Sequence, residues 1–277
     1  MKSYENIYTP LLKAFLSFPL LLLLFMLQGC EKFEYSPYEV RLSKDEQGLN
    51  QRNIERILSL NLSPADTLRF VLTADTQGFY EDNEALVKEL NKRGDINFVL
   101  LGGDITDFGL LKEFRWVHES FDKLKVPYVA VIGNHDATGN GKQVFKAMYG
   151  EYDFSFTVAK RKFIFLNTNY LEFGKQAPDL DWLDSAFGDP STYDHVFVVS
   201  HIPPASPEFG EENAVRYGEI LRRRKASLSI HGHTHNFKYY KMQEEGVYHL
   251  DVATTNKREY IVMSVFGKHV DFERVKF

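Results

Sequence analysis

The sequence predicts an α/β fold in a single domain, built from two β-sheets with helices packed against them. Three observations predict it. Continuous apolar segments alternate with amphipathic segments between residues 68 and 136, and the same alternation resumes between 152 and 230. From residue 236 onward the chain is rich in aromatic residues and strand-like, with no further helical period.

The first thirty residues predict export. Two lysines precede an apolar run from Phe18 to Leu27, which is about half of the roughly 20 residues that a membrane span needs. The run leads to Leu-Gln-Gly-Cys, which resembles the lipobox of bacterial lipoproteins. We therefore expect residues 1–29 to be a lipoprotein-type signal peptide and Cys30, the only cysteine, to be lipidated and to anchor the protein to the membrane of a bacterial cell envelope, facing the periplasm or the surface. The alternatives are a cleaved secretory signal with a chance cysteine, or a short anchor.

Residues 30–66 are expected to form a tether and a short helix. The segment after Cys30 is polar and charged with no sustained period, whereas residues 49–60 place Ile54, Ile57 and Leu58 on one helical face. The folded domain is then expected to occupy residues 67–277.

The first half of this domain reads as strands that alternate with helices. Strands are predicted at 68–75, 96–104 and 126–136, and helices at 81–94 and 110–124. Continuous apolar strands separated by helices imply parallel pairing with both faces covered. Ligand sites in such sheets lie beyond the carboxyl ends of the strands, so one edge should collect the polar residues at those ends: Asp75, Asp104, Asn134 and His135.

The second half repeats this logic. Two consecutive strands are predicted at 152–168, helices at 179–187 and 212–225, and strands at 195–201 and 226–230. Four further strand-like segments, expected to complete the second sheet, lie near 236–242, 247–253, 258–265 and 269–277. His201 ends one strand, and the sequence "HGHTH" follows another, so the late histidines should join the early carboxylates if the strand ends of both sheets meet.

Composition narrows the function classes. Hydrophobic residues make up 44% and aromatic residues 14% of the 277-residue chain, which is enough to build a large core. The net charge of −5 and the absence of a basic tract argue against polymeric nucleic acid as the main partner. The short "RRRK" at 222–225 is better explained by the end of a helix, where basic groups complement the exposed carbonyls. No oligomeric state is predicted.

Five sequence blocks, taken together and in order, resemble the metallophosphoesterases of the calcineurin-like superfamily. They are Asp75, "GDITD" at 103–107, "GNHD" at 133–136, His201 after an apolar strand, and "GHTH" at 232–235. The resemblance extends over about 68–277. It implies a two-sheet sandwich flanked by helices and an enzyme that hydrolyses a small phosphorylated substrate, either a monoester or a diester.

The resemblance also implies a pair of divalent metal ions, drawn from Mn, Fe, Zn and Mg with Mn favoured. Asp104 would bridge the two ions; Asp75 and His235 would complete the first site, and Asn134, His201 and His233 the second. An oxygen and imidazole shell suits such ions. A hydroxide held between them would be the nucleophile, His135 would protonate the leaving group, and Asp107 and Asp136 would orient imidazoles.

One block departs from the family pattern. Gln77 stands where the commoner pattern, Asp-any-His, supplies an imidazole to the first metal. An amide oxygen can still coordinate a metal ion, but imidazole is the better ligand for zinc-like ions. The presence of Gln77 therefore favours Mn²⁺ or Mg²⁺ at the first site. Alternatively, Gln77 turns away to bind substrate or water. The sequence leaves both alternatives open.

Two function classes follow. The favoured class is a metal-dependent phosphoesterase, and the alternative is a non-catalytic surface lipoprotein that binds a phosphorylated or glycan ligand on the same fold. The presence of His135 favours hydrolysis, because a binding protein needs no leaving-group acid. His231 lies outside the matched pattern and is interpreted as a strand-end or pocket-wall residue. Four aromatic residues of the rim loops could stack on substrate or pack locally: Phe79, Tyr80, Tyr170 and Phe209.

Overall fold

The computed structural model describes residue 36 and residues 38–277, of which 38–277 form one compact unit. The predicted signal peptide and the predicted lipidation site, Cys30, lie outside the described residues. Within the described part of the chain, no helix has the length and apolar character needed to cross a membrane.

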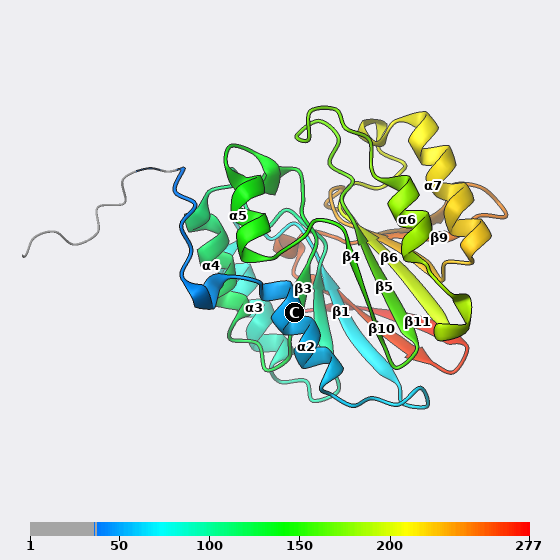
Figure 1. The fold of residues 1–277 in the computed structure, drawn as a ribbon. Coiled ribbons are helices and arrows are strands. Elements are labelled where there is room, and N and C mark those ends of the chain that lie inside the picture. Colours follow the sequence, from blue (N-terminus) through cyan, green and yellow to red (C-terminus); the bar gives the residue numbers. More distant parts are fainter. Residues whose placement is uncertain (1–35, 37) are drawn as a thin grey trace, which may run out of the picture. The chain divides into compact units, whose positions relative to one another are not determined.

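The strands form two sheets (Figure 1). The first has the order β11-β10-β1-β2-β3, with bounds β1 Leu68–Thr73, β2 Phe98–Leu101, β3 Tyr128–Ala130, β10 Glu259–Phe266 and β11 His269–Lys276. The second has the order β4-β5-β6-β7-β9-β8, with bounds β4 Phe154–Val158, β5 Arg161–Leu166, β6 His195–Ser200, β7 Leu228–His231, β8 Lys238–Lys241 and β9 Tyr248–Asp251.

Helices cover the outer faces of both sheets. The α-helices are α2 Leu49–Leu58, α3 Tyr80–Leu90, α4 Leu111–Phe121, α5 Gly141–Met148, α6 Leu180–Ala186 and α7 Glu211–Arg224. Short 3₁₀ turns occur at η1 Lys44–Glu46, η2 His135–Ala137, η3 Pro190–Thr192, η4 Pro207–Phe209 and η5 Thr255–Lys257. Helices α3, α4 and α5 pack on the first sheet, whereas α6 and α7 pack on the second. The expected sandwich flanked by helices is confirmed.

Aromatic rings fill the space between the two sheets. Phe70 of the first sheet lies with its ring centroid 5.1 Å from that of Phe163 and 5.4 Å from that of Phe197, both in the second sheet. All three rings are fully buried. Because side chains alternate along a strand, Val71 points the other way and joins the core under the helices. This packing brings the carboxyl ends of β1, β2, β6 and β7 to one edge.

One detail of the predicted topology is wrong. The segments near 258–265 and 269–277 were expected in the second sheet, but β10 pairs antiparallel with β1, and β11 extends the first sheet beyond it. β10 is almost entirely buried, and it covers the strand edge that β1 would otherwise expose. An apolar pattern shows that a segment forms a strand but not which edge it pairs with.

The segment before residue 67 is more ordered than a tether. Helix α2 buries Leu49, Ile54 and Ile57, whereas Leu58 is 47% exposed instead of packed as expected. Asn50 of this helix both donates to and accepts from the backbone of Ala130 at 2.9 Å, so that α2 closes the free edge of β3. The folded unit therefore begins at Tyr38.

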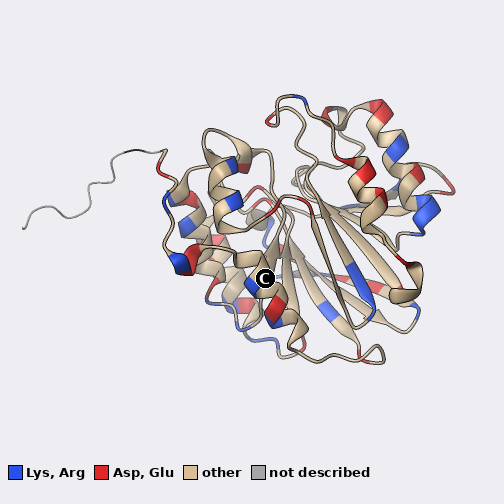
Figure 2. Ribbon diagram, viewed as in Figure 1, with Lys and Arg blue, Asp and Glu red and all other residues tan. Residues whose placement is uncertain are grey.

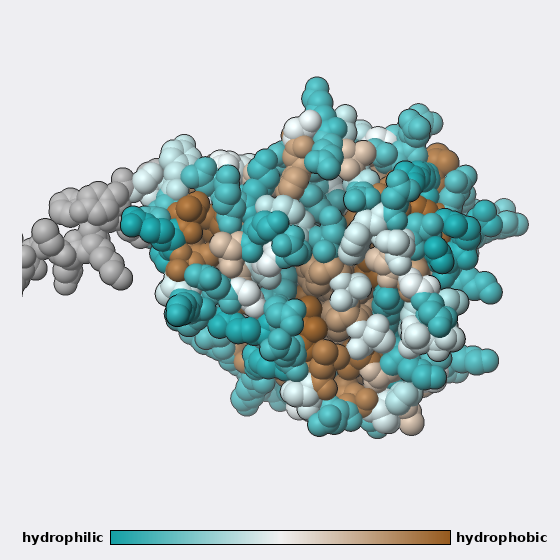
Figure 3. Space-filling view, viewed as in Figure 1, coloured by the Kyte–Doolittle hydropathy of each residue, from teal (hydrophilic) through white to brown (hydrophobic). Residues whose placement is uncertain are grey.

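The outer helices present mixed charge, as Figure 2 shows for one side of the molecule. Helix α7 ends in the basic residues of "RRRK" as expected, and Arg223 and Arg224 both pair with Asp184 of α6, at 2.9 and 2.6 Å. The same face is mostly hydrophilic, with apolar residues exposed in limited patches (Figure 3). Helix α5 was not predicted, because its sequence begins in a loop rich in glycine and asparagine.

Candidate metal centre

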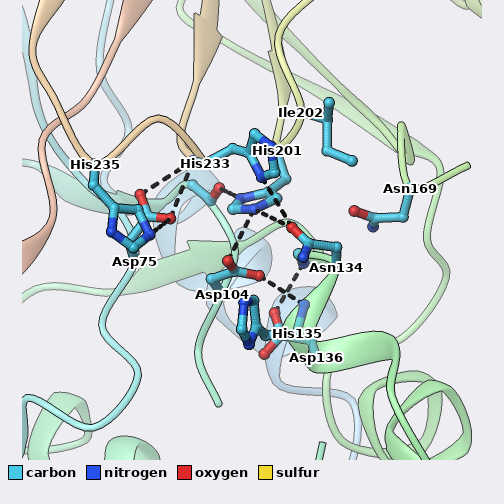
Figure 4. Close-up of polar contacts among 12 residues, drawn as sticks. Asp75, Asp104, Asn134, His135, Asp136, Asn169, His201, Ile202, His233 and His235 are labelled. Carbon is cyan, nitrogen blue, oxygen red and sulfur yellow. Dashed lines mark hydrogen bonds and ion pairs between the residues drawn. The ribbon is translucent and has the colours of Figure 1, made fainter. Parts of the chain in front are cut away.

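The polar residues that end the strands meet at one place (Figure 4). Asp75, Asp104 and Asn134 follow β1, β2 and β3 of the first sheet. His201 follows β6 of the second sheet, and His233 and His235 follow β7. The early carboxylates and the late histidines therefore come together across the two sheets, as the sequence predicts.

Backbone hydrogen bonds join the loops that present these residues. The amide of Asp75 donates to the carbonyl of Gly103 at 3.0 Å, and the amide of Gly232 donates to the carbonyl of His201 at 3.1 Å. The loops at the two sheets are also linked, because the Nδ1 atom of His201 lies 2.7 Å from the carbonyl of Gly102. These contacts satisfy loop backbone groups that are buried away from water.

Two glycines of the sequence motifs are required by this close approach. Gly103 has a φ of +90°, and a Cβ atom there would lie 2.6 Å from Nδ1 of His201. A Cβ atom at Gly133 would overlap the backbone and carboxylate of Asp104. The glycines in "GDITD" and "GNHD" therefore allow the bridging candidate Asp104 to pack against its neighbours.

Four of the candidate ligands have left-handed backbone conformations. The φ angles are 52° at Asp75, 52° at Asp104, 68° at His233 and 56° at His235. Residues other than glycine in this region cost about 1 to 3 kcal/mol each and persist only where surrounding contacts impose them. Such strain is frequent at functional sites, and here it falls on four of the candidate ligands.

One group of candidate ligand atoms, those expected at the second metal site, surrounds Asn134. Its Oδ1 atom lies 3.1 Å from Nε2 of His201 and 3.0 Å from Nδ1 of His233. The Nε2 atom of His201 also lies 3.2 Å from Oδ2 of Asp104. Ligand atoms of Asp104, His201 and His233 all lie within 4.8 Å of one another, a spacing at which they could hold a metal ion.

The other group, expected at the first metal site, shares Asp104 with the group around Asn134. Ligand atoms of Asp75, Asp104 and His235 lie within 4.8 Å of one another, and Nε2 of His235 is 3.4 Å from Oδ1 of Asp75. The carboxylate of Asp75 also accepts a hydrogen bond from the amide of His233 at 3.0 Å. Asp104 is thus the one carboxylate common to both groups.

Burial makes this concentration of charge costly. Asp75 and Asp104 are 0% and 1% exposed. Burial raises the pKa of Asp75 well above its ordinary value. Burial also acts to raise the pKa of Asp104, but the adjacent His201 lowers it overall. A pair of buried carboxylates with imidazoles at their oxygens is a site that a cation stabilises.

The donor set fits divalent metal ions. Carboxylate and amide oxygens with imidazole nitrogens form the mixed shell that Mn, Fe and Zn accept. Gln77 is 5% exposed, and its side-chain Oε1 atom is buried without a hydrogen-bond partner among the described residues. The backbone amide of Gln77 donates to the carbonyl of Asp104 at 3.1 Å, so Gln77 lies beside the candidate bridging residue. A buried acceptor left without a donor fits a metal ligand, and it also fits the alternative in which Gln77 binds substrate or water.

His135 lies beside Asp104, but its surroundings differ from expectation. Its amide donates to Oδ1 of Asp104 at 3.0 Å, and its Nδ1 atom lies 2.9 Å from the main-chain carbonyl of Asp107. Asp107 therefore contacts an imidazole as expected, although it does so through its main-chain carbonyl and not its carboxylate. The remaining ring nitrogen, Nε2, is left for other partners.

Asp136 has a structural role that was not predicted. Its carboxylate contacts no imidazole in the described part of the chain. Instead it accepts hydrogen bonds at 2.8 Å from the amides of Ile105, Thr106 and Gly133. The expectation that it orients an imidazole is therefore wrong; the buried amides of two loops need an acceptor, and Asp136 supplies it.

Several other predicted residues do not reach the centre. His231 ends β7 as expected and is buried, with its ring nitrogens 2.9 Å from the hydroxyls of Ser200 and Ser229. Phe209 is fully buried and packs on Tyr217, so it is a core residue and not available to stack on substrate.

Glu208 lies near the centre but was not among the predicted site residues. Its Oε2 atom is 3.8 Å from Nε2 of His233. Its loop was expected at the rim, but no pattern singled it out.

Comparison with known proteins agrees with this geometry. The family model for calcineurin-like phosphoesterases matches residues 68–237, which is more than half of the chain. The chain belongs to this family and is accordingly a hydrolase that acts on phosphate esters. The family binds divalent metals. No curated protein matches the sequence significantly.

Solved structures share the fold at low sequence identity. GAP50, described as the anchor in the inner membrane complex of Plasmodium, is 17% identical with a TM-score of 0.60, over 76% of this chain and 84% of that chain. The purple acid phosphatase PPD1 from yellow lupin seeds is 13% identical with a TM-score of 0.62, over 78% of this chain and 52% of that chain, so the match spans about half its length. PhoD is 10% identical with a TM-score of 0.56, over 76% of this chain and 69% of that chain. These likenesses show the fold alone.

We predict that Gln77→His changes metal binding. Imidazole is a better ligand than an amide oxygen for zinc-like ions, so the variant should retain its metal more tightly and shift its preference toward zinc. Elemental analysis of both proteins after purification and after dialysis, with the rate measured against added Mn²⁺ and Zn²⁺, tests this. Unchanged metal content and unchanged preference would show that Gln77 is not a ligand.

We also predict that the stabilisation of the fold by Mn²⁺ depends on pH. Burial alone would lower the pKa of His201, but the adjacent Asp104 raises it from 6.5 to about 10. The protonated ring therefore stabilises the metal-free fold fully below pH 6.5, and this contribution is lost as pH rises toward about 10. Metal binding needs the neutral ring. The increase in Tm that Mn²⁺ produces should accordingly grow across this window.

Thermal denaturation with Mn²⁺ and with a chelator, repeated across the same pH range, measures this increase. His201→Asn should remove most of its pH dependence. An increase in Tm that stays constant with pH in the unaltered protein would contradict the prediction.

Proposed function

We propose that hydrolysis occurs at the centre described above, with two divalent ions that share Asp104. The observation that supports this most directly is that two groups of candidate ligand atoms, each within 4.8 Å, have Asp104 in common. Mn²⁺ is the favoured ion among Mn, Fe, Zn and Mg, because Gln77 offers an amide oxygen in place of an imidazole. The substrate is a small phosphorylated molecule, either a monoester or a diester.

Bound divalent ions would neutralise the phosphate ester and lower the pKa of water toward about 7. The chain's own residues would arrange the remaining chemistry. The carbonyl of Asp107 holds Nδ1 of His135, so Nε2 is the ring nitrogen left to donate a proton to the leaving oxygen. The hydrogen bond from the His135 amide to Asp104 keeps this proton donor beside the shared carboxylate.

The alternative is a lipoprotein that binds a phosphorylated or glycan ligand without hydrolysing it. The fold alone admits this alternative, because GAP50 is described as an anchor. What favours hydrolysis here is that the two groups of candidate ligand atoms lie together at the strand ends, with His135 beside them. A binding protein would not require that histidine.

We further propose that the protein works outside the cytoplasm, held to the bacterial cell envelope by a lipid on Cys30. The support comes from the sequence, where an apolar run of signal-peptide length leads to Leu-Gln-Gly-Cys. The folded unit starts at Tyr38, only a few residues after Cys30. On this proposal the substrate is met close to the membrane surface.

We predict that a protein lacking residues 1–30 hydrolyses phenyl phosphate or its diester when Mn²⁺ is added. His135→Ala should lower kcat by about 10² to 10⁴, because a positioned proton donor contributes this much. Metal content should not change. His269→Ala, which alters an exposed histidine on β11, is the matched control and should keep full activity. No turnover above His135→Ala with any of several metals would favour the binding alternative.

We also predict that Cys30→Ser releases the protein from the membrane. Two acyl chains anchor a protein stably, and the serine variant would carry none at this position. Fractionation of bacterial cells that express each protein, with a labelled fatty acid to detect acylation, measures this. Ser36→Ala is the control and should remain with the membranes. Retention of Cys30→Ser in the membrane fraction would instead indicate a short peptide anchor.

A further inference from the structure

A cavity of about 440 Å³ lies directly beside the metal centre. It shares the ligand His233 with that centre, so a molecule whose phosphate lies at the ligands can extend into it. The volume falls within the range of about 300 to 1,000 Å³ that is usual for small-molecule sites. The cavity is therefore large enough for the part of a substrate that surrounds its phosphate.

The two walls of this cavity differ in chemistry. The loop after β6 contributes small and rigid apolar residues, with Pro203, Ala205 and Pro207 among them. Strands β8 and β9 contribute polar residues, Lys238, Tyr240 and Asp251, and Thr234 joins them from between the two candidate ligands His233 and His235. A ring with one apolar face and several hydroxyls matches such a pair of walls.

Asp251 is a buried acidic residue of the polar wall with weak hydrogen-bond partners. It is only 1% exposed. Among the described residues, its carboxylate accepts only long hydrogen bonds, 3.3 Å from the hydroxyl of Tyr240 and 3.4 Å from that of Thr234. Bonds between a hydroxyl and an oxygen are usually about 2.5 to 3.0 Å. A nearly buried carboxylate with weak donors is costly, and a ligand hydroxyl would satisfy it.

Lys238 complements this acceptor. It is exposed, and its backbone pairs with that of Asp251 in the β8–β9 ladder. Burial raises the pKa of Asp251 to about 6, while the ammonium group of Lys238 acts in the opposite direction. Lys238 is thus a donor to ligand oxygens next to an acceptor of ligand hydroxyls, the combination that a polyol can use.

The polar wall is held from behind. The ring of Tyr240 stacks on that of His249 with centroids 5.4 Å apart, and Nδ1 of His249 lies 3.2 Å from Nε2 of His231. His231 and His249 are both buried. The two histidines, which the metal centre does not use, therefore fix the position of the wall rather than contact a ligand.

We propose that this cavity is a subsite for a hydroxyl-rich group of the substrate, a sugar or a related polyol, with Asp251 accepting from its hydroxyls and Lys238 donating to its oxygens. This inference rests on the proposed function, because it assigns the alcohol portion of the phosphate ester. The competing explanation is that Asp251 only holds Thr234, and with it the loop that carries His233 and His235.

Two esters separate these explanations. Glucose 6-phosphate offers hydroxyls to the cavity, whereas phenyl phosphate offers none. We expect Asp251→Asn to lower kcat/KM for glucose 6-phosphate about 10-fold or more, mainly through KM, because a charge-assisted hydrogen bond is lost. Phenyl phosphate should change by less than about 2-fold. Equal losses with both esters, or a lower metal content, would show that Asp251 acts only on the metal-ligand loop.

Lysine variants supply a second test with little risk to folding. Lys238→Met should weaken only the sugar ester, and Lys241→Met, at the other end of the same strand and outside the cavity, should change neither. Loss with both lysine variants alike, or with neither, would overturn the subsite.

Phenyl phosphate separates failure of the subsite from failure of the proposed function. If it is hydrolysed and the sugar ester shows no selective effect, the subsite is wrong and the phosphoesterase assignment stands. If neither ester is hydrolysed, calorimetric titration of glucose 6-phosphate into the Mn²⁺-loaded protein and the Asp251→Asn variant decides the subsite directly. Selective weakening in the variant supports it, and equal binding or no binding contradicts it.

Discussion

Two carboxylates, those of Asp75 and Asp104, are buried side by side where two sheets meet, and much of the molecule is arranged around them. Burial of charge is unfavourable unless opposite charge or hydrogen-bond donors compensate it. Here the imidazoles that follow strands of the second sheet lie beside the carboxylate oxygens that follow strands of the first. Nε2 of His201, for example, is 3.2 Å from Oδ2 of Asp104. Neither sheet could stabilise this arrangement alone. The interface between the sheets is therefore both the core of the fold and the wall of the site.

The scaffold also accepts local strain to hold this site. The strained features are the close approach at Gly103 and the left-handed backbone at Asp75, Asp104, His233 and His235. They persist because backbone hydrogen bonds link the loops, and because the rings of Phe70, Phe163 and Phe197 hold the two sheets together. Strain of this kind is a cost to stability that a rigid aromatic core offsets. A divalent ion would relieve part of the electrostatic cost, since metal binding and folding are coupled through the same ligands.

Chemistry and selectivity are separated in this architecture. The strand ends carry the candidate metal ligands, and the fold alone does not distinguish a hydrolase from an anchor. The individual character lies in the adjoining walls, where Asp251 and Lys238 come from a β-hairpin beyond the shared ligands. The two sets of residues touch through Thr234, which contacts Asp251 and is flanked by two metal-ligand candidates. A change of substrate preference on this fold can thus proceed without a change of metal chemistry.

The sequence by itself predicted the sandwich class and most of the strands and helices, although not α5, because apolar periodicity is a local property of the chain. The candidate metal ligands came from the resemblance of five short motifs to the calcineurin-like family, since such motifs are also local. Only the tertiary structure decided that β10 and β11 join the first sheet, that α2 closes the edge of β3, and that Asp107 holds His135 through its carbonyl. It also decided that Asp136 binds loop amides and that Asp251 lines a cavity. These features depend on which edge, carbonyl or amide lies nearby after folding, and contacts between residues far apart in the chain leave no local pattern to read.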